Sequence, residues 1–457
     1  MTAAPQRQPR VTMFVYNNMV HDARVRKEAR TLTEAGYDVT VLAVLDPGVT
    51  PREESVRGFR ILRMSRSILG ISRREIATRM AQRGGSRASP GTPKSASRRQ
   101  TARRPRAVSA LEAIVKSLLF PLRRVLVFLR FVRAALRTGA DAYHAHDLNT
   151  LLVAWTASRL RRKPLIYDTH EIATDRADMT FRWWAALLER ALIGRADRVI
   201  CTNQTRADFT EKLYNTPPPV ILRNLPAYVE PQPSTLMHER LGLPADAKIV
   251  LYQGGMQPER GLEQLMEAAP EIQGGVIVFL GSGRSKPRLM ARAAELGLEG
   301  KVYFHEAVPV EELPSLTACA YVGLQLLQNT CFNHYSSLSN KLLEYMMAGV
   351  PVIANDLPEM RRVIEDTGAG VIIDASDPHA ITGAVNKLLA DPALREQMSR
   401  QAAANRGRYC WETEERKLVA LYAGLGFGPA PPAAAGGRSG ETEERAGRSH
   451  AGGDAIR

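Results

Sequence analysis

Short apolar runs alternate with helix-length segments along almost the whole chain. The runs in the first half are 11–16, 37–45, 59–65, 141–147, 164–171, 197–203 and 219–224. Those in the second half are 248–255, 274–283, 301–308, 320–328, 350–356 and 369–374. Runs rich in Val and Ile, separated by helical lengths, are typical of parallel strands covered by helices on both faces. The pattern therefore predicts an α/β protein with two arrays of strands.

A Pro-rich stretch near 225–245 separates the two arrays, and 457 residues are too many for one ordinary core. We expect two Rossmann-like, doubly wound parallel-sheet domains, over 10–225 and 245–410. Two segments lack apolar periodicity: the Arg/Ser/Pro/Gly-rich 79–108 and the Pro/Ala/Gly-rich tail 425–457. Such compositions predict a disordered basic insertion and a disordered tail.

The cysteines and the hydropathy of the chain indicate the cellular compartment expected for this protein. The four cysteines lie far apart, with no CxxC pair and no nearby His spacing suited to zinc, which predicts buried thiols in a reducing cytoplasm. The first residues lack the apolar core of a signal peptide. No run of 18 uncharged apolar residues occurs, so we expect no membrane-spanning segment.

The positive charge of the chain is concentrated in one segment. The formal net charge is +15, but residues 57–137 hold 21 Lys and Arg against two Glu, a local balance of +19 that leaves −4 for all other residues. Any partner attracted by basicity should therefore meet this segment.

Part of the basic segment, 111–139, has the pattern of an amphipathic helix. On a helical wheel Arg123, Arg130, Arg133 and Arg137 share one side, opposite a mostly Leu and Val face. One interpretation is a helix that simply covers the first sheet. Another is a cationic face that meets an anionic membrane surface while the apolar face is buried. Nucleic acid is less favoured, because the segment has few aromatic residues for base stacking.

Two glycine-containing loops follow strands of the second array. Gly254 and Gly255 come directly after the first of these strands and lead through Arg260 into a helix, and Gly283 follows the next strand. Glycines let backbone N–H groups approach a phosphate, a helix N-terminus favours its charge, and arginine offers a planar pair of donors. Because strand–glycine–helix joints are common, each loop alone is a weak signal.

The stretch SLSNKLLEYMMAGVPVIAND, 337–356, places an amide, a cation and a carboxylate within one helical turn. Taken alone, Asn340, Lys341 and Glu344 could be a solvated helix face. Because this helix starts beyond a strand on the same side as the glycine loops, we expect Lys341 to reach a phosphate and Glu344 to bind ribose hydroxyls. The arrangement predicts a site for a nucleoside diphosphate.

In the first array, YHAHD (143–147) and YDTHE (167–171) end two successive strands with His-Asp and His-Glu pairs. A single strand histidine is usually structural, but two such ends favour a functional site. His170, with His146 and Asp147, is therefore a candidate. Neither pair has zinc-like spacing to a third ligand, and no DxD occurs, so we expect no bound metal.

These motifs resemble those of the retaining nucleotide-sugar glycosyltransferases of the GT-B fold, family four. The resemblance covers Val11 to Gly424 except 67–110. It is most specific in 337–356 and extends to YQGGMQPERGLEQLMEA (252–268), to both His-containing strand ends and to DARVRKEARTLTEAGYDVTVLA (22–43). It implies two domains that face each other across a cleft, with a last helix, 411–424, crossing back to the first domain.

By resemblance, the chain transfers a sugar with retention from a nucleoside-diphosphate sugar to a glycan, lipid-linked or small-molecule acceptor, without a cofactor. Catalysis is assigned to His170, Arg260 and Lys341. Donor binding is assigned to Gly254, Gly255, Gly283, Asn340 and Glu344, and the acceptor side to His146 and Asp147. Such enzymes often work on lipid carriers, which agrees with a peripheral position on the cytoplasmic membrane face.

Two positions depart from the family pattern. Ser336 stands where the family usually has the first of two glutamates near the donor sugar, and Gly255 stands where an arginine is frequent. The alternatives to a transferase are a GT-B nucleotide-sugar epimerase and a non-catalytic nucleotide-sugar-binding protein.

Overall fold

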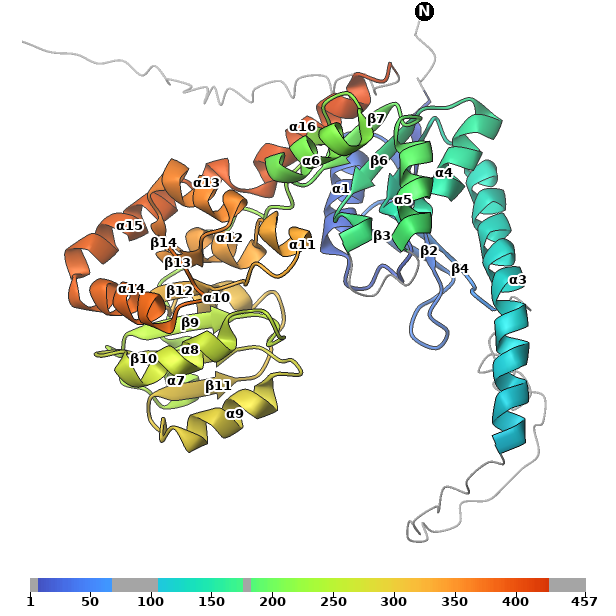
Figure 1. Ribbon diagram of the computed structural model, residues 1–457. Helices are drawn as coiled ribbons and strands as arrows, with labels where there is room; N and C mark the ends of the chain where they lie inside the picture. The colour runs from blue at the N-terminus through green and yellow to red at the C-terminus, as the bar shows by residue number, and fades with distance from the viewer. Residues whose placement is uncertain (1–6, 68–105, 176–181, 427–457) are drawn as a thin grey trace, which may run out of the picture.

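The computed structural model describes residues 7–67, 106–175 and 182–426, and of 106–120 only the backbone. The chain forms two α/β domains side by side, as the strand pattern predicts (Figure 1). Of the predicted disordered insertion, 79–108, only 106–108 are described, and these begin a helix rather than a disordered segment. Of the predicted tail, 425–457, only 425–426 are described.

The first domain is built on an eight-stranded sheet with the order β3-β4-β2-β1-β5-β6-β7-β8. All neighbours are parallel except β3 and β4. The strands are β1 (Arg10–Phe14), β2 (Asp38–Val44), β3 (Glu53–Val56), β4 (Phe59–Met64), β5 (Ala142–His146), β6 (Leu165–Thr169), β7 (Arg198–Cys201) and β8 (Val220–Ile221).

Strand β3 was missed by the sequence analysis. None of its four residues is buried, so it has no apolar run, and it forms only as the edge of a hairpin with β4. The two-residue turn between them, Arg57-Gly58, has positive φ at both positions, the geometry of a tight hairpin turn.

Helices cover both faces of this sheet. One face packs against α3 (Arg106–Thr138), α4 (Leu148–Arg161) and α5 (Arg182–Ile193), and the other against α1 (Ala23–Glu34) and α16 (Trp411–Ala423). Helix α6 (Gln204–Tyr214) connects β7 to β8, and a 3₁₀ turn spans Ala173–Asp175.

The second domain has a six-stranded, fully parallel sheet with the order β11-β10-β9-β12-β13-β14. Its strands are β9 (Ile249–Gln253), β10 (Val276–Leu280), β11 (Val302–His305), β12 (Val322–Gln325), β13 (Val352–Asn355) and β14 (Gly370–Ile373). Apolar side chains fill both faces, which explains the continuous apolar runs in the sequence.

The helices of the second domain are α7 (Leu236–Leu241), α8 (Leu262–Ala268), α9 (Lys286–Glu295), α10 (Leu313–Thr317), α11 (Phe332–Tyr335), α12 (Asn340–Met347), α13 (Pro358–Thr367), α14 (Pro378–Ala390) and α15 (Pro392–Ala404), with 3₁₀ turns over Ala269–Glu271 and Arg406–Arg408. The residues of α7 pack into this domain's core with Leu225. The core therefore reaches back before residue 245, where the sequence pattern begins the domain.

Helix α16 returns from the second domain to the first and packs on α1 (Figure 1). Trp411 at its start is fully buried, and its indole N–H donates to Thr31 Oγ1 at 3.0 Å. Lys27 Nζ lies 4.9 Å from the centroid of the Trp411 ring. Tyr422 near the helix end lies 3.0 Å from His144 Nδ1 in the centre of the first domain. The chain's last described helix is thus part of the first domain's core.

None of the helices in the described part of the chain is both long and apolar enough to cross a membrane.

We expect Trp411→Ala to lower the unfolding free energy of the first domain by about 3–5 kcal/mol, because it leaves a large cavity between α1 and α16. Urea denaturation followed by circular dichroism measures this. Trp184→Ala is the matched control: its side chain is exposed, and surface changes stay within about 0.5 kcal/mol. Equal destabilisation by the two variants would contradict this account of the helix.

Candidate functional site

In each sheet the strand order reverses direction once, and segments that follow β1, β5 and β12, next to these reversals, line one cavity. The reversal lies between β1 and β5 in the first sheet and between β9 and β12 in the second. Ligands of open parallel sheets bind beyond the carboxyl ends of the strands at such points. The cavity of about 700 Å³ lies here, between the domains, and is lined by loops from both.

Four helices begin at the cavity wall. Its lining includes Asp22 before α1, Asp147 before α4, Asn203 before α6 and Ser339 before α12. Each helix N-terminus directs a partial positive charge outward, although the side chains of Asp22 and Asn203 already accept from one first-turn N–H group of α1 and of α6. Several such ends around one cavity favour an anionic ligand.

The two predicted phosphate loops run against each other. Gly254 N–H donates to Leu280 O at 2.8 Å, and Met256 N–H donates to Ser282 O at 2.9 Å. At Gly283, whose φ is +156°, a Cβ would lie 2.2 Å from Met256 O. Only glycine permits so close an approach of two backbones. Gly254 and Gly283 therefore shape one surface, although neither lines the cavity itself.

Lys341 joins these loops to the cavity. Its side chain lies across Gly254, where a Cβ would meet Lys341 Cε at 2.4 Å, and the residue also lines the cavity. Burial and the nearby charge of Arg260 lower the pKa of Lys341 to about 8, against the opposing effect of Glu344. Arg260 is half-buried beside it. Two neighbouring cations without a full complement of anions indicate a place for a ligand's negative charge.

Glu344 lies one turn further along α12, half-buried, and accepts a 2.6 Å hydrogen bond from Gln253 Nε2. Burial raises the pKa of this carboxyl group, while Gln253 and Lys341 lower it in part. Asn340 is exposed at the cavity wall, whereas Gly255 is exposed in the loop after β9. The structure thus gathers the predicted donor-side residues at one corner of the second domain.

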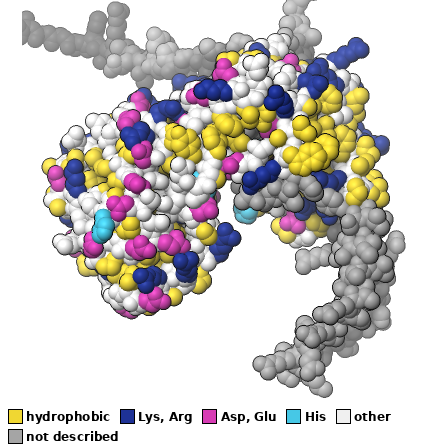
Figure 2. Space-filling model, viewed as in Figure 1, with side chains coloured by type: hydrophobic (Ala, Val, Ile, Leu, Met, Phe, Trp, Pro, Cys, Tyr) yellow, Lys and Arg dark blue, Asp and Glu magenta, His cyan; other side chains and the backbone are white. Residues whose placement is uncertain are grey.

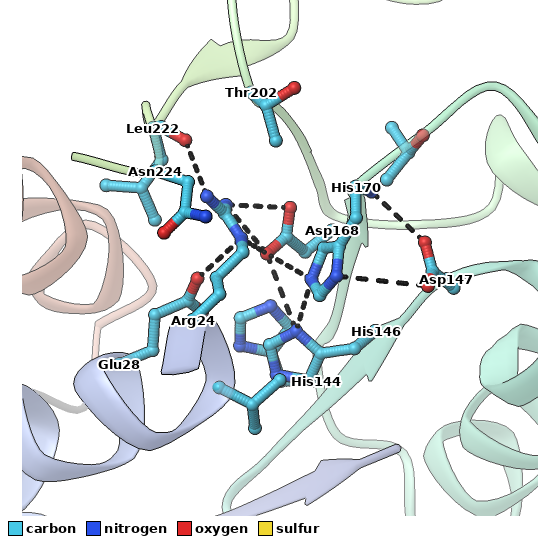
Figure 3. Close-up of polar contacts among 12 residues, drawn as sticks. Arg24, Glu28, His144, His146, Asp147, Asp168, His170, Thr202, Leu222 and Asn224 are labelled. Carbon is cyan, nitrogen blue, oxygen red and sulfur yellow. Dashed lines mark hydrogen bonds and ion pairs between the residues drawn. The ribbon is translucent and has the colours of Figure 1, made fainter. Parts of the chain in front are cut away.

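His170 lies at the first domain's side of the same cavity, held between two carboxylates (Figure 3). Its Nε2 is 3.2 Å from Asp168 Oδ2 and its Nδ1 is 3.8 Å from Asp147 Oδ2. Although burial lowers it, Asp147 and Asp168 raise the pKa of His170 to about 9. The imidazole is therefore a cation at neutral pH.

Asp168 is held in turn by Arg24 from α1. The guanidinium donates to both carboxylate oxygens at 2.8–3.0 Å and to Leu222 O at 3.0 Å, and both side chains are buried (Figure 3). Burial acts to raise the pKa of Asp168, but Arg24 and His170 lower it well below its usual range. The Arg24 side chain thus connects the start of α1 to the end of β6 and to Leu222, which follows β8.

His146 lies behind His170 rather than at the cavity. It is 1% exposed, and its Nδ1 is 3.1 Å from His170 Nε2. Its neighbour Asp147 does line the cavity. Of the two acceptor-side candidates, only Asp147 is in a position to touch a ligand there.

Four buried side chains of the described residues have ligand atoms within 4.8 Å of one another: Glu28, His144, His146 and Asp168. Arg24 contacts both carboxylates, since it lies 2.9 Å from Glu28 Oε1 and 2.8 Å from Asp168 Oδ2. Burial raises the pKa of Glu28 to about 7, although Arg24 lowers it in part. The two imidazole rings are stacked with centroids 4.2 Å apart, so their lone pairs do not converge in one plane. The cluster is a charge network, and its residues do not fit a metal.

Arg206 connects the two domains beside His170. It donates to His170 O, to Ser336 Oγ at 3.0 Å and to Asn333 O at 3.2 Å. Asn203 Nδ2 donates to Ser336 O at 2.6 Å. The serine that replaces the family's usual glutamate is fully buried in this contact.

The sequence analysis missed Arg24, Asp168, Asn203 and Arg206. Asn203 and Asp168 have a local signal, because both occur at the end of a strand. Arg24 and Arg206 have none: their partners are 144 and 130 residues away along the chain.

Comparison with known proteins identifies the family of this chain. The family profile described as "Glycosyl transferases group 1" matches residues 234–405, and "Glycosyl transferase 4-like domain" matches residues 22–224. Together the two matches span both domains. The chain belongs to glycosyltransferase family four. This GT-B glycosyltransferase uses a nucleotide-sugar donor.

Curated relatives include D-inositol 3-phosphate glycosyltransferases. That of Thermobispora bispora is 27% identical over 64% of this glycosyltransferase and 74% of its own length. That of Acidothermus cellulolyticus is 28% identical over 64% and 70%.

Solved structures share the fold. Sucrose-phosphate synthase from Thermosynechococcus elongatus has a TM-score of 0.67 at 19% identity, covering 92% of this glycosyltransferase and 99% of its own chain. Anabaena HepE in complex with UDP has a TM-score of 0.66 at 14% identity, covering 91% and 100%.

We expect Gly254→Ala to weaken binding of a nucleoside diphosphate at least about tenfold, because a Cβ would collide with Lys341 and strain a residue with φ +113°. Gly383→Ala is the matched control, since this residue lies in α14 outside the assigned site and its Cβ would meet nothing within 4 Å. Titration calorimetry with UDP measures both. If Gly254→Ala binds as tightly as the unaltered enzyme, Lys341 does not hold the diphosphate through this contact.

Proposed function

We propose that the enzyme moves a sugar from a nucleoside-diphosphate sugar to a glycan, lipid-linked or small-molecule acceptor with retention at the anomeric carbon. The observation that carries this proposal is the meeting of Lys341, the start of α12 and His170 around one cavity between the domains. In the proposal, the second domain holds the nucleotide and the first domain presents the acceptor.

The leaving diphosphate gains negative charge as its bond to the sugar breaks. Lys341, Arg260 and the N–H groups at the start of α12 stabilise that charge. They are suited to this role because they are fixed before the reaction and partly removed from water. Glu344 binds the ribose, for which its half-buried carboxylate beside Gln253 is suited.

His170 orients the donor sugar. Two roles follow from the resemblance: orienting the sugar, or stabilising an oxocarbenium-like transition state. A protonated imidazole repels a developing cation, so a pKa of about 9 favours the first role. Arg206 supports it by fixing the His170 carbonyl to the loop before α12.

We propose that no bound metal is needed, since Arg260, Lys341 and a helix N-terminus provide the positive charge at the diphosphate. Activity should then survive EDTA. UDP is the favoured nucleotide because similar structures were determined in complex with UDP and UDP-glucose. Among acceptors we favour a lipid-linked one, with the enzyme on the cytoplasmic face of the cell membrane.

Incubation with labelled nucleotide sugars, beginning with UDP-glucose, tests the proposal. Transfer to an acceptor or slow hydrolysis with release of UDP supports it, and the anomeric configuration of the product tests retention. Epimerised nucleotide sugar or binding without turnover would instead support one of the two alternatives.

We expect Lys341→Ala and Arg260→Ala each to lower kcat by about 10²–10³, the usual cost of removing one preorganised donor to a transition-state charge. Steady-state kinetics with the best donor measures the loss. Arg288→Ala removes an exposed cation of α9 and should leave the rate unchanged. Full activity in the Lys341/Arg260 double variant would rule this assignment out.

The rate should also depend on pH through Lys341. Burial and Arg260 lower its pKa to about 8, so the ammonium is present below that pH and is lost as pH rises through it. We expect kcat/KM to fall above about pH 8. In Lys341→Arg, which stays protonated, the fall should move to higher pH. An unchanged profile would assign the titration to another group.

A further inference from the structure

Helices α3, α4 and α5 form one continuous layer on the outside of the first domain. Helix α3 contacts α4 and α4 contacts α5, and inner side chains such as Phe131, Leu151 and Leu192 are buried against the sheet. We call the described residues 121–138, 148–161 and 182–193 the outer layer. Its opposite side faces away from the sheet, on the right of Figure 1.

The exposed charges of the outer layer are all positive. Its exposed arginines are Arg123, Arg124, Arg133, Arg137, Arg159, Arg161, Arg182 and Arg190. Its one acidic residue within these ranges, Glu189, is 3% exposed and accepts hydrogen bonds from the hydroxyl groups of Tyr167 and Tyr214. Within the described layer, no exposed carboxylate therefore offsets Arg133, Arg137, Arg159, Arg161 or Arg190.

Large apolar side chains are exposed among these arginines. Trp183 and Trp184 at the start of α5 are each 59% exposed, with stacked rings whose centroids are 4.6 Å apart, and Leu187 is 53% exposed. Figure 2 shows hydrophobic side chains gathered in the region of α4 and α5, with Lys and Arg beside them. Tryptophan rings in this setting are typical of the water–lipid interface.

Helix α3 adds a second apolar stripe: Leu122, Val125 and Leu129 are 48%, 53% and 52% exposed. The sequence analysis expected the Leu and Val face opposite the arginines to be buried. That expectation is wrong for these three residues, although Val132 of the same face is buried. The helix is rotated so that Val127, Phe131 and Ala135 pack on the sheet. Arg130 is not part of the outward stripe, because it donates to the Ser65 and Ser67 carbonyls.

We infer that the outer layer is a docking surface for an anionic lipid membrane. Exposed arginines attract anionic head groups, and the exposed tryptophan and leucine side chains enter the boundary between head groups and acyl chains. Charge alone would also suit a nucleic acid. However, the tryptophans stack on each other, and the Leu and Val stripe has no use on a phosphate backbone. The surface rests on the membrane rather than spanning it.

A membrane-docking surface supports the proposed preference for a lipid-linked acceptor. The link between docking and sugar transfer rests on the proposed function, whereas the docking itself does not. Binding to a membrane would hold the first domain, the proposed acceptor side, close to the lipid. Vesicle binding itself is independent of sugar transfer, so the two proposals can fail separately.

Co-sedimentation of the full chain with vesicles tests the inference. We expect binding to phosphatidylcholine mixed with phosphatidylglycerol, little binding to phosphatidylcholine alone, and release by high salt. Arg133→Gln/Arg137→Gln/Arg190→Gln should weaken partitioning on the order of a hundredfold, since each arginine contributes a factor of roughly five. Trp183→Ser/Trp184→Ser should weaken it at least about tenfold.

The matched control is Arg288→Gln/Arg292→Gln/Arg400→Gln, which removes the same charge from exposed sites of the second domain and should bind as the unaltered protein does. Hydrolysis of UDP-glucose without vesicles should be unchanged in the tryptophan variant, which separates loss of docking from loss of fold.

Three outcomes would overturn the inference. The first is no binding to the anionic vesicles at low salt. The second is an equal loss of binding in the control variant, which would make the attraction one of total charge alone. The third is a dimer in light scattering that the tryptophan variant converts to a monomer while vesicle binding stays the same, because the apolar surface would then belong to a second copy.

Discussion

The position of the site in this glycosyltransferase is set by the carboxyl ends of its parallel strands. In both sheets the order reverses once, beside β1 and beside β9, and loops leaving adjacent strands at that point must diverge. The cavity is lined by segments that follow β1 and β5 in the first domain and by residues 337–341, which follow β12, in the second. Because helix N-termini follow the same strand ends, the topology itself gives the cavity a positive potential before any side chain is considered.

The charged side chains of the two walls of the cavity are arranged differently. On the second domain's wall, burial and the nearby Arg260 disfavour the charge of Lys341, a cost that a bound diphosphate would relieve. On the first domain's wall the charges are already paired: Arg24 neutralises Asp168, and Asp168 with Asp147 keeps His170 protonated. One wall is thus prepared for an anion, whereas the other is a rigid, hydrogen-bonded frame.

The two helical layers of the first domain differ in how much apolar surface they leave exposed. Helices α1 and α16 close one face with buried aromatic residues such as Trp411 and Tyr422, and thereby connect the first domain to the end of the second. The opposite layer buries its inner side but leaves tryptophan, leucine and arginine side chains outside. Helices α1 and α16 therefore connect the two domains. Helices α3, α4 and α5 leave an exposed surface that can contact a membrane.

The sequence by itself determined the parallel strands of both sheets and the helix turn that carries the proposed donor-binding residues. Continuous Val- and Ile-rich runs of strand length, separated by helix-length segments, are typical of buried parallel strands, and the spacing of Asn340, Lys341 and Glu344 fixes them on one turn of α12. The close contact of the glycine loops follows equally from local sequence, since Gly254 and Gly283 adopt backbone angles that other residues rarely adopt.

Only the tertiary structure decided the rest. The Arg24–Asp168 pair and the Arg206–Ser336 contact join residues more than a hundred positions apart, and no local pattern encodes such partners. The rotation of α3 depended on which side chains fit the sheet: periodicity gave a helix with several apolar sides, and packing selected Phe131 rather than Leu129 for the core. The edge strand β3 likewise exists only because β4 provides its hydrogen-bonding partner.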